Sequence, residues 1–544
     1  MTRIVFAAAI SLFLIAGAAL AEVPTPAIPT FEEVTKSSGV SSTYTGEYLY
    51  MVGGGAATFD CDKDGFPDLF TAGGAGRSSF FRNVAKQGGA LKFKKQKSGL
   101  ELDKVTGAYP LDIDADGNID LVVLRVGENK VMRGLGHCKF EVANKRWGFN
   151  GGEAWTTAFT ATFEKGAFWP TMAVGNYIDP KQEISPWGSC TENWLHRARI
   201  DQKKPSYAFT KPVPLTPSYC SLSMLFTDWN RSGTPSLRVS NDREYYEGGE
   251  EQMWKFTPRE VPTLYTDKDG WKRLRIWGMG IASADINGDS FPDYFLTSMA
   301  DSKLQMLKEV KTDGTSKADF KDVAWPSGVT LHRPTFGDDL KNSTAWHAQF
   351  EDVNNDGLVD LFVAKGNIDS MQDFAMKDPN NLALGKSDGR FVDVAKDAGV
   401  ASTQTSRGGM VVDFNLDGLM DLVVVNRRSP AQVWRNTSKG LGHWLDVKLE
   451  QDGANRDGIG AWIEVKRDDV ITRREITAGG GHASGQLGWW HFGLGAADKA
   501  EIRVLWPYAE PGPWQAVSAD GFYVLKAGAE PKRWTPKHML HRPQ

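Results

Sequence analysis

Short runs of hydrophobic residues, alternating or continuous, recur along most of the chain and are separated by turns rich in glycine and aspartate. Ala57-Thr-Phe59, Leu69-Phe-Thr71 and Leu422-Val-Val-Val425 are examples. Runs of this length and composition predict β-strands. From Trp444-Leu-Asp-Val-Lys-Leu449 onward, glycine-punctuated alternation continues the pattern. The sequence therefore predicts an all-β protein with a second, smaller β-sandwich-like unit toward its C-terminus.

Five of the turns share one spacing of oxygen-bearing side chains. Each reads D-x-[DN]-x-D with a further aspartate at the ninth position, and four of the five carry glycine at the sixth. Glycine permits the turn with positive φ that such a loop requires. The side-chain positions are Asp60, Asp62, Asp64 and Asp68; Asp112, Asp114, Asp116 and Asp120; Asp285, Asn287, Asp289 and Asp293; Asp352, Asn354, Asp356 and Asp360; and Asp413, Asn415, Asp417 and Asp421. The seventh position of each loop would add a backbone carbonyl, at Phe66, Asn118, Phe291, Leu358 and Leu419.

Oxygen ligands at this spacing suit calcium, a hard cation that takes roughly six to eight of them. One alternative is a set of Asp/Gly turns without metal, which five matching copies argue against. The EF-hand is another, but it needs a glutamate at the twelfth position and flanking helices. Here the twelfth position is apolar or small, and the flanks are β-rich. We therefore expect about five calcium (Ca2+) sites in turns between strands.

The five loops belong to a longer repeat. Phe31-Glu-Glu-Val34 recurs as Phe320-Lys-Asp-Val323 and Phe391-Val-Asp-Val394, each followed by Gly-Val. Two degenerate loops, Gly175-Asn-Tyr-Ile-Asp179 and the segment from Asp228 to Ser236, bring the count to seven units of propeller-blade length. The Phe31 strand would complete the last unit and close a ring, which removes exposed sheet edges. The alternative is a linear β array.

Charge and composition narrow the range of partners. The 544 residues include 63 Lys and Arg against 67 Asp and Glu, a formal charge of −4, with no long basic run. Nucleic acid is therefore not an expected partner. The 19 tryptophans would suit stacking on sugars, although packing in the β core is the favoured explanation.

The N-terminus has the features of a secretory signal. Arg3 precedes an apolar run, Ile4 to Ala18, and Ala19-Leu-Ala21 has the form of a cleavage site. The alternative is an uncleaved membrane anchor. No later apolar run reaches about 18 residues. We expect an exported chain, periplasmic or extracellular, with no stable membrane insertion after cleavage.

Four cysteines, an even number, permit disulfides in an exported chain. Cys190 and Cys220 bracket an insertion in the third unit, where a bridge would staple the unit together. Cys61 and Cys138 form the remaining pair by subtraction. No C-x2-C spacing favours a metal role for these residues.

The C-terminal motifs resemble those of the ASPIC/UnbV domain, and the loops resemble FG-GAP/VCBS repeats. The motifs are Asn455-Arg-Asp-Gly458-Ile-Gly460, Gly479-Gly-Gly481-His-Ala-Ser484, His491-Phe-Gly-Leu-Gly495 and Val504-Leu-Trp-Pro507. The resemblance implies a seven-bladed, integrin-α-like propeller, calcium binding, and an extracytoplasmic adhesion or matrix role. The expected organisation is a signal peptide at 1–21, a linker at 22–30, a propeller at 31–438 with an insertion near 180–220, an ASPIC/UnbV domain at 439–530, and a tail at 531–544.

Two functions stay open. The first is a binding, adhesion or scaffold module for a protein or glycan, because no catalytic set is evident. The second is a calcium-dependent polysaccharide lyase or hydrolase with its groups at a central pore. His491 lies in a strand-like segment and is expected to be structural, whereas His482, in a glycine-rich loop, is a candidate functional residue. The insertion around Cys190, with Trp187 and Trp194, is a candidate functional surface.

Overall fold

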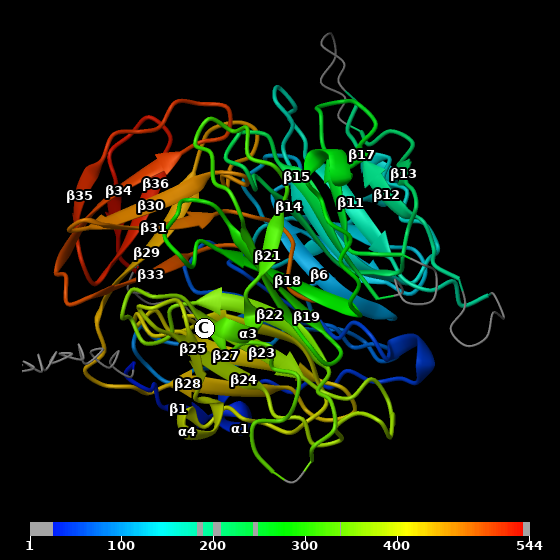
Figure 1. The fold of residues 1–544 in the computed structure, drawn as a ribbon, viewed down its shortest axis with the longest axis horizontal. Helices are drawn as coiled ribbons and strands as arrows, with labels where there is room; N and C mark the ends of the chain where they lie inside the picture. Colours follow the sequence, from blue (N-terminus) through cyan, green and yellow to red (C-terminus); the bar gives the residue numbers. More distant parts are fainter. Residues whose placement is uncertain (1–25, 182–188, 200–207, 243–248, 338, 537–544) are drawn as a thin grey trace, which may run out of the picture.

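The computed structural model describes residues 26–181, 189–199, 208–242, 249–337 and 339–536, which fold mostly into β-strands (Figure 1). The expected signal peptide lies outside these residues. Seven sheets, six with four strands and one with five, follow one another along the described chain before a C-terminal unit of two further sheets, which confirms the all-β prediction. Within the described ranges, no helix has the length and apolar character needed to cross a membrane.

Sheets 1 to 7 are numbered here by the chain order of their first strands. Sheet 1 contains β2 (Ala56–Phe59), β3 (Asp68–Thr71), β4 (Ser79–Asn83) and β5 (Phe93–Lys95), extended by β32 (Gly485–Gln486). Sheet 2 contains β6 (Val105–Leu111), β7 (Asp120–Arg125), β8 (Lys130–Gly134) and β9 (Phe140–Val142). Sheet 3 contains β10 (Thr156–Thr162), β11 (Thr171–Asn176), β12 (Asn193–His196) and β13 (Val213–Leu215). Sheet 4 contains β14 (Ser221–Thr227), β15 (Ser236–Asn241), β16 (Gln252–Lys255) and β17 (Thr263–Leu264).

The remaining three sheets of this series have the same order. Sheet 5 contains β18 (Gly278–Ala284), β19 (Asp293–Ser298), β20 (Lys303–Leu307) and β21 (Phe320–Asp322). Sheet 6 contains β22 (Ala345–Glu351), β23 (Asp360–Lys365), β24 (Asn381–Gly385) and β25 (Phe391–Asp393). Sheet 7 contains β26 (Ser406–Val412), β27 (Asp421–Asn426), β28 (Gln432–Asn436) and β1 (Phe31–Glu33).

The first strands of successive sheets contact one another, from β2 and β6 through to β22 and β26, and β26 in turn contacts β2. The order of neighbours is therefore circular, and we call these seven sheets the ring. β1 comes from the start of the chain, yet it pairs with β28, with Phe31 opposite Asn436. This pairing confirms the prediction that the Phe31 strand completes the last sheet and covers its edge.

Burial differs between the inner and outer strands of each sheet. Every residue of β6, β10, β14 and β26 is buried, because neighbouring sheets cover both faces. The outer strand β5 buries only Phe93 and exposes two lysines. Short helices follow four outer strands and end at glycines in the left-handed region, with φ between 62° and 86°. They are α1 (Thr35–Ser38), α2 (Asn144–Trp147), α3 (Ala324–Ser327) and α4 (Ala395–Ala398). Single 3-10 turns occur at Tyr48–Tyr50 and Asp267–Asp269.

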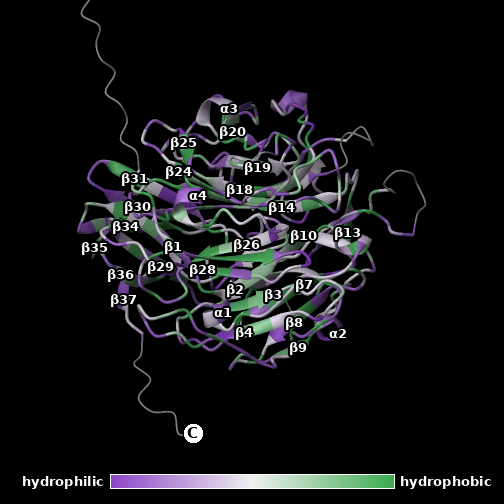
Figure 2. Ribbon diagram, turned by 90° about the horizontal axis from the view of Figure 1, so that it is seen from below, coloured by the Kyte–Doolittle hydropathy of each residue, from purple (hydrophilic) through white to green (hydrophobic). Residues whose placement is uncertain are grey.

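The C-terminal unit is a sandwich of two four-stranded sheets, which lies beside the ring and on the opposite side of the molecule from β13 (Figure 2). One sheet contains β33 (Trp490–Gly495), β29 (His443–Glu450), β36 (Gly521–Lys526) and β37 (Lys532–Trp534). The other contains β31 (Val470–Glu475), β30 (Trp462–Arg467), β34 (Lys499–Leu505) and β35 (Gln515–Ser518). Alternate apolar residues of both sheets, among them Leu445, Ile463 and Ile502, form its core.

A glycine-rich stretch of the C-terminal unit, residues 478–486, enters the ring between the inner strands, and we call it the central segment. Ala478 bridges to Ala161 of sheet 3, and Gly481 to Ile281 of sheet 5. Gly485 then pairs with Ala57 of sheet 1. The central segment therefore joins several sheets through its backbone.

One assignment from the sequence is wrong. The D-x-[DN]-x-D loops all join the first and second strands of their sheets, but Asp179 follows β11, the second strand of sheet 3. The equivalent connection in sheet 3 is residues 163–170, which lacks the ligand spacing. The prediction failed because this segment shares only the strand lead-in with the other repeats and has no ligand spacing to fix its place. Asp179 lies at the other end of the strands from the metal loops.

Candidate metal centres

The five predicted loops share one pattern of backbone closure. In each, the carboxylate at the first position accepts a hydrogen bond from the amide of the sixth residue, at 2.7–3.0 Å. The sixth residue has positive φ in all five, including Ser290, at φ 79°. The carboxylate at the fifth position accepts from the amide of the seventh residue. The loops therefore hold their carboxylates in one repeated arrangement.

The ninth-position aspartates also have a structural role that the sequence did not reveal. Asp68 accepts from the amide of Cys61 at 3.0 Å and from the amide of Asn83, on the third strand, at 2.8 Å. Asp120 makes the equivalent pair of bonds in sheet 2. Each such carboxylate ties its loop to the rest of the sheet.

Burial and mutual repulsion raise the pKa values of these carboxyls. Burial, followed by the neighbouring Asp62 carboxylate, raises the pKa of Asp64 to about 7. Burial likewise raises the pKa of Asp112 to about 7 and that of Asp293 to about 8. Desolvation and like charges both disfavour the ionised form, and a bound cation reverses both effects.

Several carboxylate oxygens in the loops are buried and lack hydrogen-bond partners. They are Oδ1 of Asp62, Asp112, Asp114 and Asp285. Ligand oxygens of Asp60, Asp62 and Asp68 lie within 4.8 Å of one another, as do those of Asp112, Asp114 and Asp120. A buried carboxylate oxygen without a donor is costly unless a cation meets it. The residues therefore fit a hard, oxygen-ligated metal ion.

Arginines on the third strands of three sheets approach the loops. Arg82 contacts Asp62 at 2.6 Å, and Arg133 contacts Asp114 at 2.9 Å. Arg435 lies 3.2 Å from Asp417. Each guanidinium compensates part of the loop charge and leaves other carboxylate oxygens for an ion.

The degenerate loop of sheet 4 keeps the closure but not the ligands. The amides of Ser232 and Gly233 donate to the Asp228 carboxylate at 2.9 Å each. Serines occupy its fifth and ninth positions, and the Ser236 hydroxyl accepts from Trp229 Nε1 at 3.2 Å. The turn therefore forms without the carboxylates that would bind an ion.

The C-terminal unit contacts all six of these loops, which we call the rim. Its contacts are Trp489 Nε1 to the Gly65 carbonyl at 2.9 Å, Arg456 to Asp112 at 3.5 Å, Glu475 to the Asp228 amide at 2.7 Å, Arg473 to Asp285 at 3.5 Å, Arg467 to the Gly357 carbonyl at 2.7 Å, and the ring of Trp444 against Gly418. In sheet 4, Arg231 also stacks on Trp462 at 4.1 Å. The rim therefore lies beneath the C-terminal unit.

At the centre of the ring, which we call the axis, His482 of the central segment is fully buried. Its Nε2 accepts from the Gly53 amide at 3.0 Å, and its own amide donates to His347 Nδ1 at 3.1 Å. Burial lowers the pKa of His482 to about 3 and that of His347 to about 4. Both rings are therefore neutral near pH 7, and His482 has backbone and packing partners that the sequence could not show.

The structure also shows the surroundings of His491 and the pairing of the four cysteines. His491 is buried between Asp446 and Asn355, with 2.7 Å from its Nε2 to the Asn355 Oδ1. Burial opposes its charge, but the Asp446 carboxylate raises the pKa of His491. The structure contains two disulfides, Cys61–Cys138 and Cys190–Cys220.

The fold and the loops define the class of protein. The family model for ASPIC and UnbV matches residues 451–532, and that for the FG-GAP-like repeat matches residues 60–123 and 352–424. The chain thus contains FG-GAP-like repeats and a C-terminal ASPIC/UnbV domain.

Its relatives among curated proteins are cartilage acidic protein 1 of several animals. The mouse protein is 32% identical over 104 residues, which cover 18% of this chain and 16% of the relative. The human protein is 25% identical over 234 residues, covering 42% and 33%, and that of Xenopus tropicalis is 25% identical over 240 residues, covering 42% and 34%. The matches span about a third or less of these relatives.

Similar solved structures include BBS1N in complex with ARL6DN, at 8% identity and a TM-score of 0.42, covering 77% of this chain and 99% of that one. An Agrocybe aegerita lectin specific for non-reducing terminal N-acetylglucosamine has 14% identity and a TM-score of 0.40, covering 71% and 92%. Likeness at this level carries no argument about function.

Proposed function

We propose that this chain is an exported, calcium-stabilised seven-bladed β-propeller that acts as a binding scaffold, with the ASPIC/UnbV domain docked over its metal loops. The circular order of the seven sheets supports the propeller. The FG-GAP-like matches cover loops in sheets 1, 2, 6 and 7 and support the same assignment.

The observation that carries the calcium proposal is the set of buried carboxylate oxygens without partners. Asp62, Asp112, Asp114 and Asp285 each contribute one such atom. Calcium would supply the missing positive charge and would be held by these residues and their loop neighbours. In this role the ion holds the hairpin between the first and second strands and performs no reaction.

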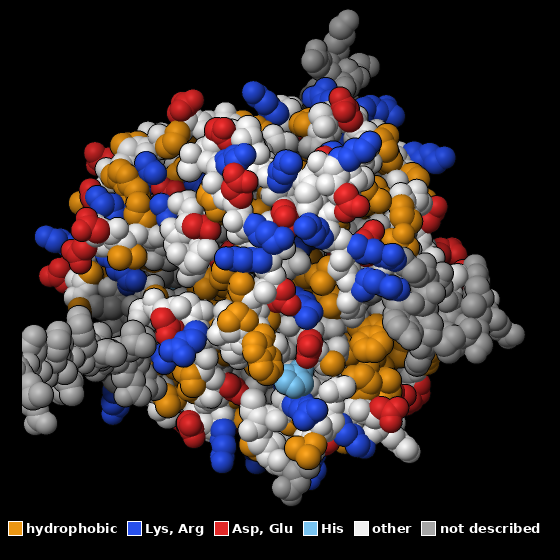
Figure 3. Space-filling model, viewed as in Figure 1, with side chains coloured by type: hydrophobic (Ala, Val, Ile, Leu, Met, Phe, Trp, Pro, Cys, Tyr) orange, Lys and Arg blue, Asp and Glu red, His pale blue; other side chains and the backbone are white. Residues whose placement is uncertain are grey.

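A binding role fits the remaining surface better than catalysis at a pore. The enzymatic alternative needed accessible groups at the centre of the ring, where the central segment now lies with His482 buried. The face shown in Figure 3 intersperses Lys and Arg with Asp and Glu over hydrophobic patches. Such a mixed surface suits a protein or glycan partner and does not favour nucleic acid.

Export is supported by the two disulfides and by the signal-like N-terminal sequence. Disulfides persist in oxidising compartments such as the periplasm and the extracellular space. Both bridges are formed between distant segments, with 77 and 30 residues of separation.

The test of this proposal is thermal unfolding before and after metal removal. Ligands that bind only the native state stabilise it by about 2.7 kcal/mol per site at a hundredfold excess over Kd. Chelation should lower the melting temperature by at least about 10 °C, and calcium, but not magnesium, should restore it. An unchanged melting temperature after removal verified by elemental analysis would overturn the calcium assignment.

A further inference from the structure

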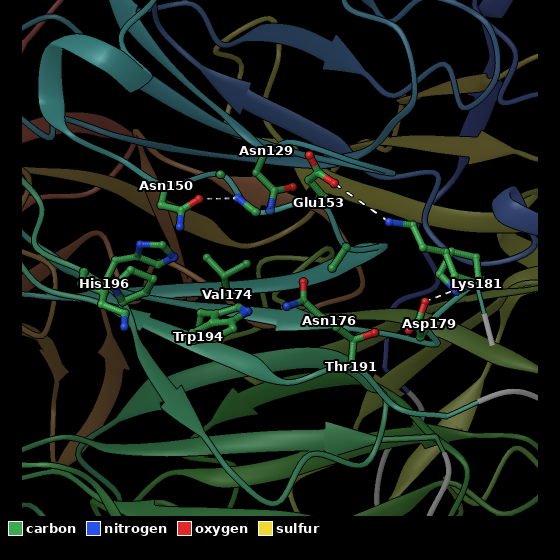
Figure 4. Close-up of a pocket in the computed structure, with 16 residues that line it drawn as sticks. Asn129, Asn150, Glu153, Val174, Asn176, Asp179, Lys181, Thr191, Trp194 and His196 are labelled. Carbon is green, nitrogen blue, oxygen red and sulfur yellow. Dashed lines mark hydrogen bonds and ion pairs between the residues drawn. The ribbon is translucent and has the colours of Figure 1, made fainter.

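A cavity of about 350 Å³ lies between sheets 2 and 3 (Figure 4). Its walls include Asn129, which follows β7, and Asp179, which follows β11. Both connections join a second strand to a third, at the opposite strand ends from the metal loops. The cavity is therefore remote from the face that the C-terminal domain covers, and it adjoins the insertion around Cys190.

The floor of this cavity is one face of β11 and β12. Trp194 lies opposite Val174 in the strand register, and His196 follows two residues later on the same face. The half-buried Trp194 indole offers an aromatic surface to the cavity. His196 is 2% exposed and packs on Phe149 with 4.6 Å between ring centroids. Packing of this kind holds the floor rigid.

Some polar groups of the wall have no hydrogen-bond partner among the described residues. His196 Nδ1 and the Thr191 hydroxyl are buried without hydrogen bonds. Burial lowers the pKa of His196 to about 3, so the ring is neutral. Asn150 accepts a bond from the Gly152 amide through Oδ1 and makes no described bond through its amide nitrogen. By contrast, Asn176 is fully engaged with Thr156 and the Glu192 carbonyl and supports the wall.

The charges of the described residues that line the cavity balance. Glu153 and Asp179 carry two negative charges, and Lys181 and Lys211 carry two positive ones. Lys181 lies 4.0 Å from Glu153. This balance favours neither an anion such as phosphate nor a cation. A tryptophan face beside unpaired donors and acceptors suits a ligand that is neutral, polar at its edge and apolar on one face.

We propose that this cavity binds one neutral sugar residue of a glycan, with the pyranose ring against Trp194 and its hydroxyls toward Asn150 and toward the part of the wall that Thr191 and His196 form. A pyranose combines a hydroxyl-bearing edge with a face of C–H groups, and a single unit fits the volume. The inference rests on the proposed binding role and gives it a ligand class. It requires no metal, because no metal loop lines the cavity.

The test is titration of the full chain, in calcium, with a panel of neutral monosaccharide methyl glycosides. Calorimetry and saturation-transfer NMR are the measurements, with glucuronate and glucose 6-phosphate as charged comparisons. A ligand of this size should bind with Kd of about 1 mM. Trp194→Ala should weaken binding about tenfold, and Thr191→Val should weaken it less.

The matched control is Trp325→Ala, because Trp325 on α3 is 77% exposed and far from the cavity in sequence and sheet. It should bind as the wild type does, and melting curves must show that each variant is folded. The proposal is overturned if no neutral sugar binds, if a charged sugar binds more tightly, or if Trp194→Ala and Trp325→Ala bind alike. Loss of sugar binding with intact calcium-dependent melting would overturn the sugar assignment and leave the metal assignment in place.

Discussion

The C-terminal domain meets the ring in two regions, the rim and the axis, and these contacts have different physical natures. At the rim, arginines and tryptophans contact loops crowded with carboxylates, and Glu475 contacts the degenerate Asp228 loop. At the axis, the central segment makes backbone bridges, and its buried His482 is neutral. The stability that the rim contributes should therefore depend on metal ions and on charge. The stability that the axis contributes should depend on side-chain volume and on protonation.

The largest expected effect comes from crowding the axis. A Cβ at Gly55 would lie 1.7 Å from the carbonyl oxygen of Ala483, a backbone atom that cannot move without shifting the central segment. Gly55→Ala should therefore destabilise the protein by about 3 kcal/mol, measured by denaturant unfolding.

The control for this variant is Gly512→Ala, at a surface turn where the nearest atom to a new Cβ is 3.2 Å away. Gly512→Ala should change stability by less than about 1 kcal/mol. Equal stability of the two variants would show that the central segment is not tightly held.

At the rim, removing one carboxylate should abolish the benefit of calcium in one sheet only. Asp64→Ala should cost about 2.7 kcal/mol at a hundredfold excess of calcium over Kd, and Asp356→Ala should behave alike. Ser232→Ala, at the same position of the Asp228 loop, is the matched control. Its cost should not depend on calcium, because that loop closes through Asp228 and backbone amides. If calcium sensitivity is the same in both variants, the distinction between the two kinds of loop fails.

Acid should act on the buried neutral histidines, which are His482 and His347 at the axis and His196 at the cavity between sheets 2 and 3. The folded-state pKa values of His482 and His347 lie below the ordinary 6.5, so in mild acid the unfolded state binds more protons. The contribution of each neutral ring to the free energy of unfolding is therefore fully present above pH 6.5. It is lost as the pH falls, by up to about 1.4 kcal/mol per pH unit for each ring. In saturating calcium, we expect the two axial rings together to account for a loss of about 2 kcal/mol between pH 7 and 5.5.

His482→Gln should reduce this pH dependence by the share of one ring, whereas His332→Gln should leave it unchanged, because His332 is half-exposed beside Asp301. Denaturant midpoints across the pH range give the slopes. A wild-type slope in His482→Gln would assign the acid sensitivity to other groups.

The sequence predicted what is local and repeated. The oxygen spacing of the loops, their position between strands, and the pairing of Phe31 with the last sheet all follow from patterns within one repeat or from its missing strand. The axis could not be predicted in the same way, because His482 and His347 are 135 residues apart and meet only through the path of the whole chain.

Two further features were beyond the reach of pattern reasoning. The motif predicted the ninth-position aspartates as metal ligands. Nothing in it indicated that the Asp68 carboxylate also accepts a hydrogen bond from the third strand. The cavity between sheets 2 and 3 combines residues from five separate segments, and the sequence drew attention to only two of them, through Trp194 and through Asp179. Sites assembled from different strands require the topology before their members can be named.

The smallest effect should come from Asp179, which the sequence placed at the rim and the structure places at the far strand end. Its carboxylate accepts from the Lys181 amide at 2.9 Å and reaches none of the metal loops. Asp179→Ala should change stability by no more than about 0.5 kcal/mol and should leave the calcium content unaltered. Asp116→Ala, in the loop of the neighbouring sheet 2, provides the comparison and should lower the calcium content by one ion. A calcium loss in Asp179→Ala would place a metal site at this end of sheet 3 and would undo the assignment of metal loops to the rim alone.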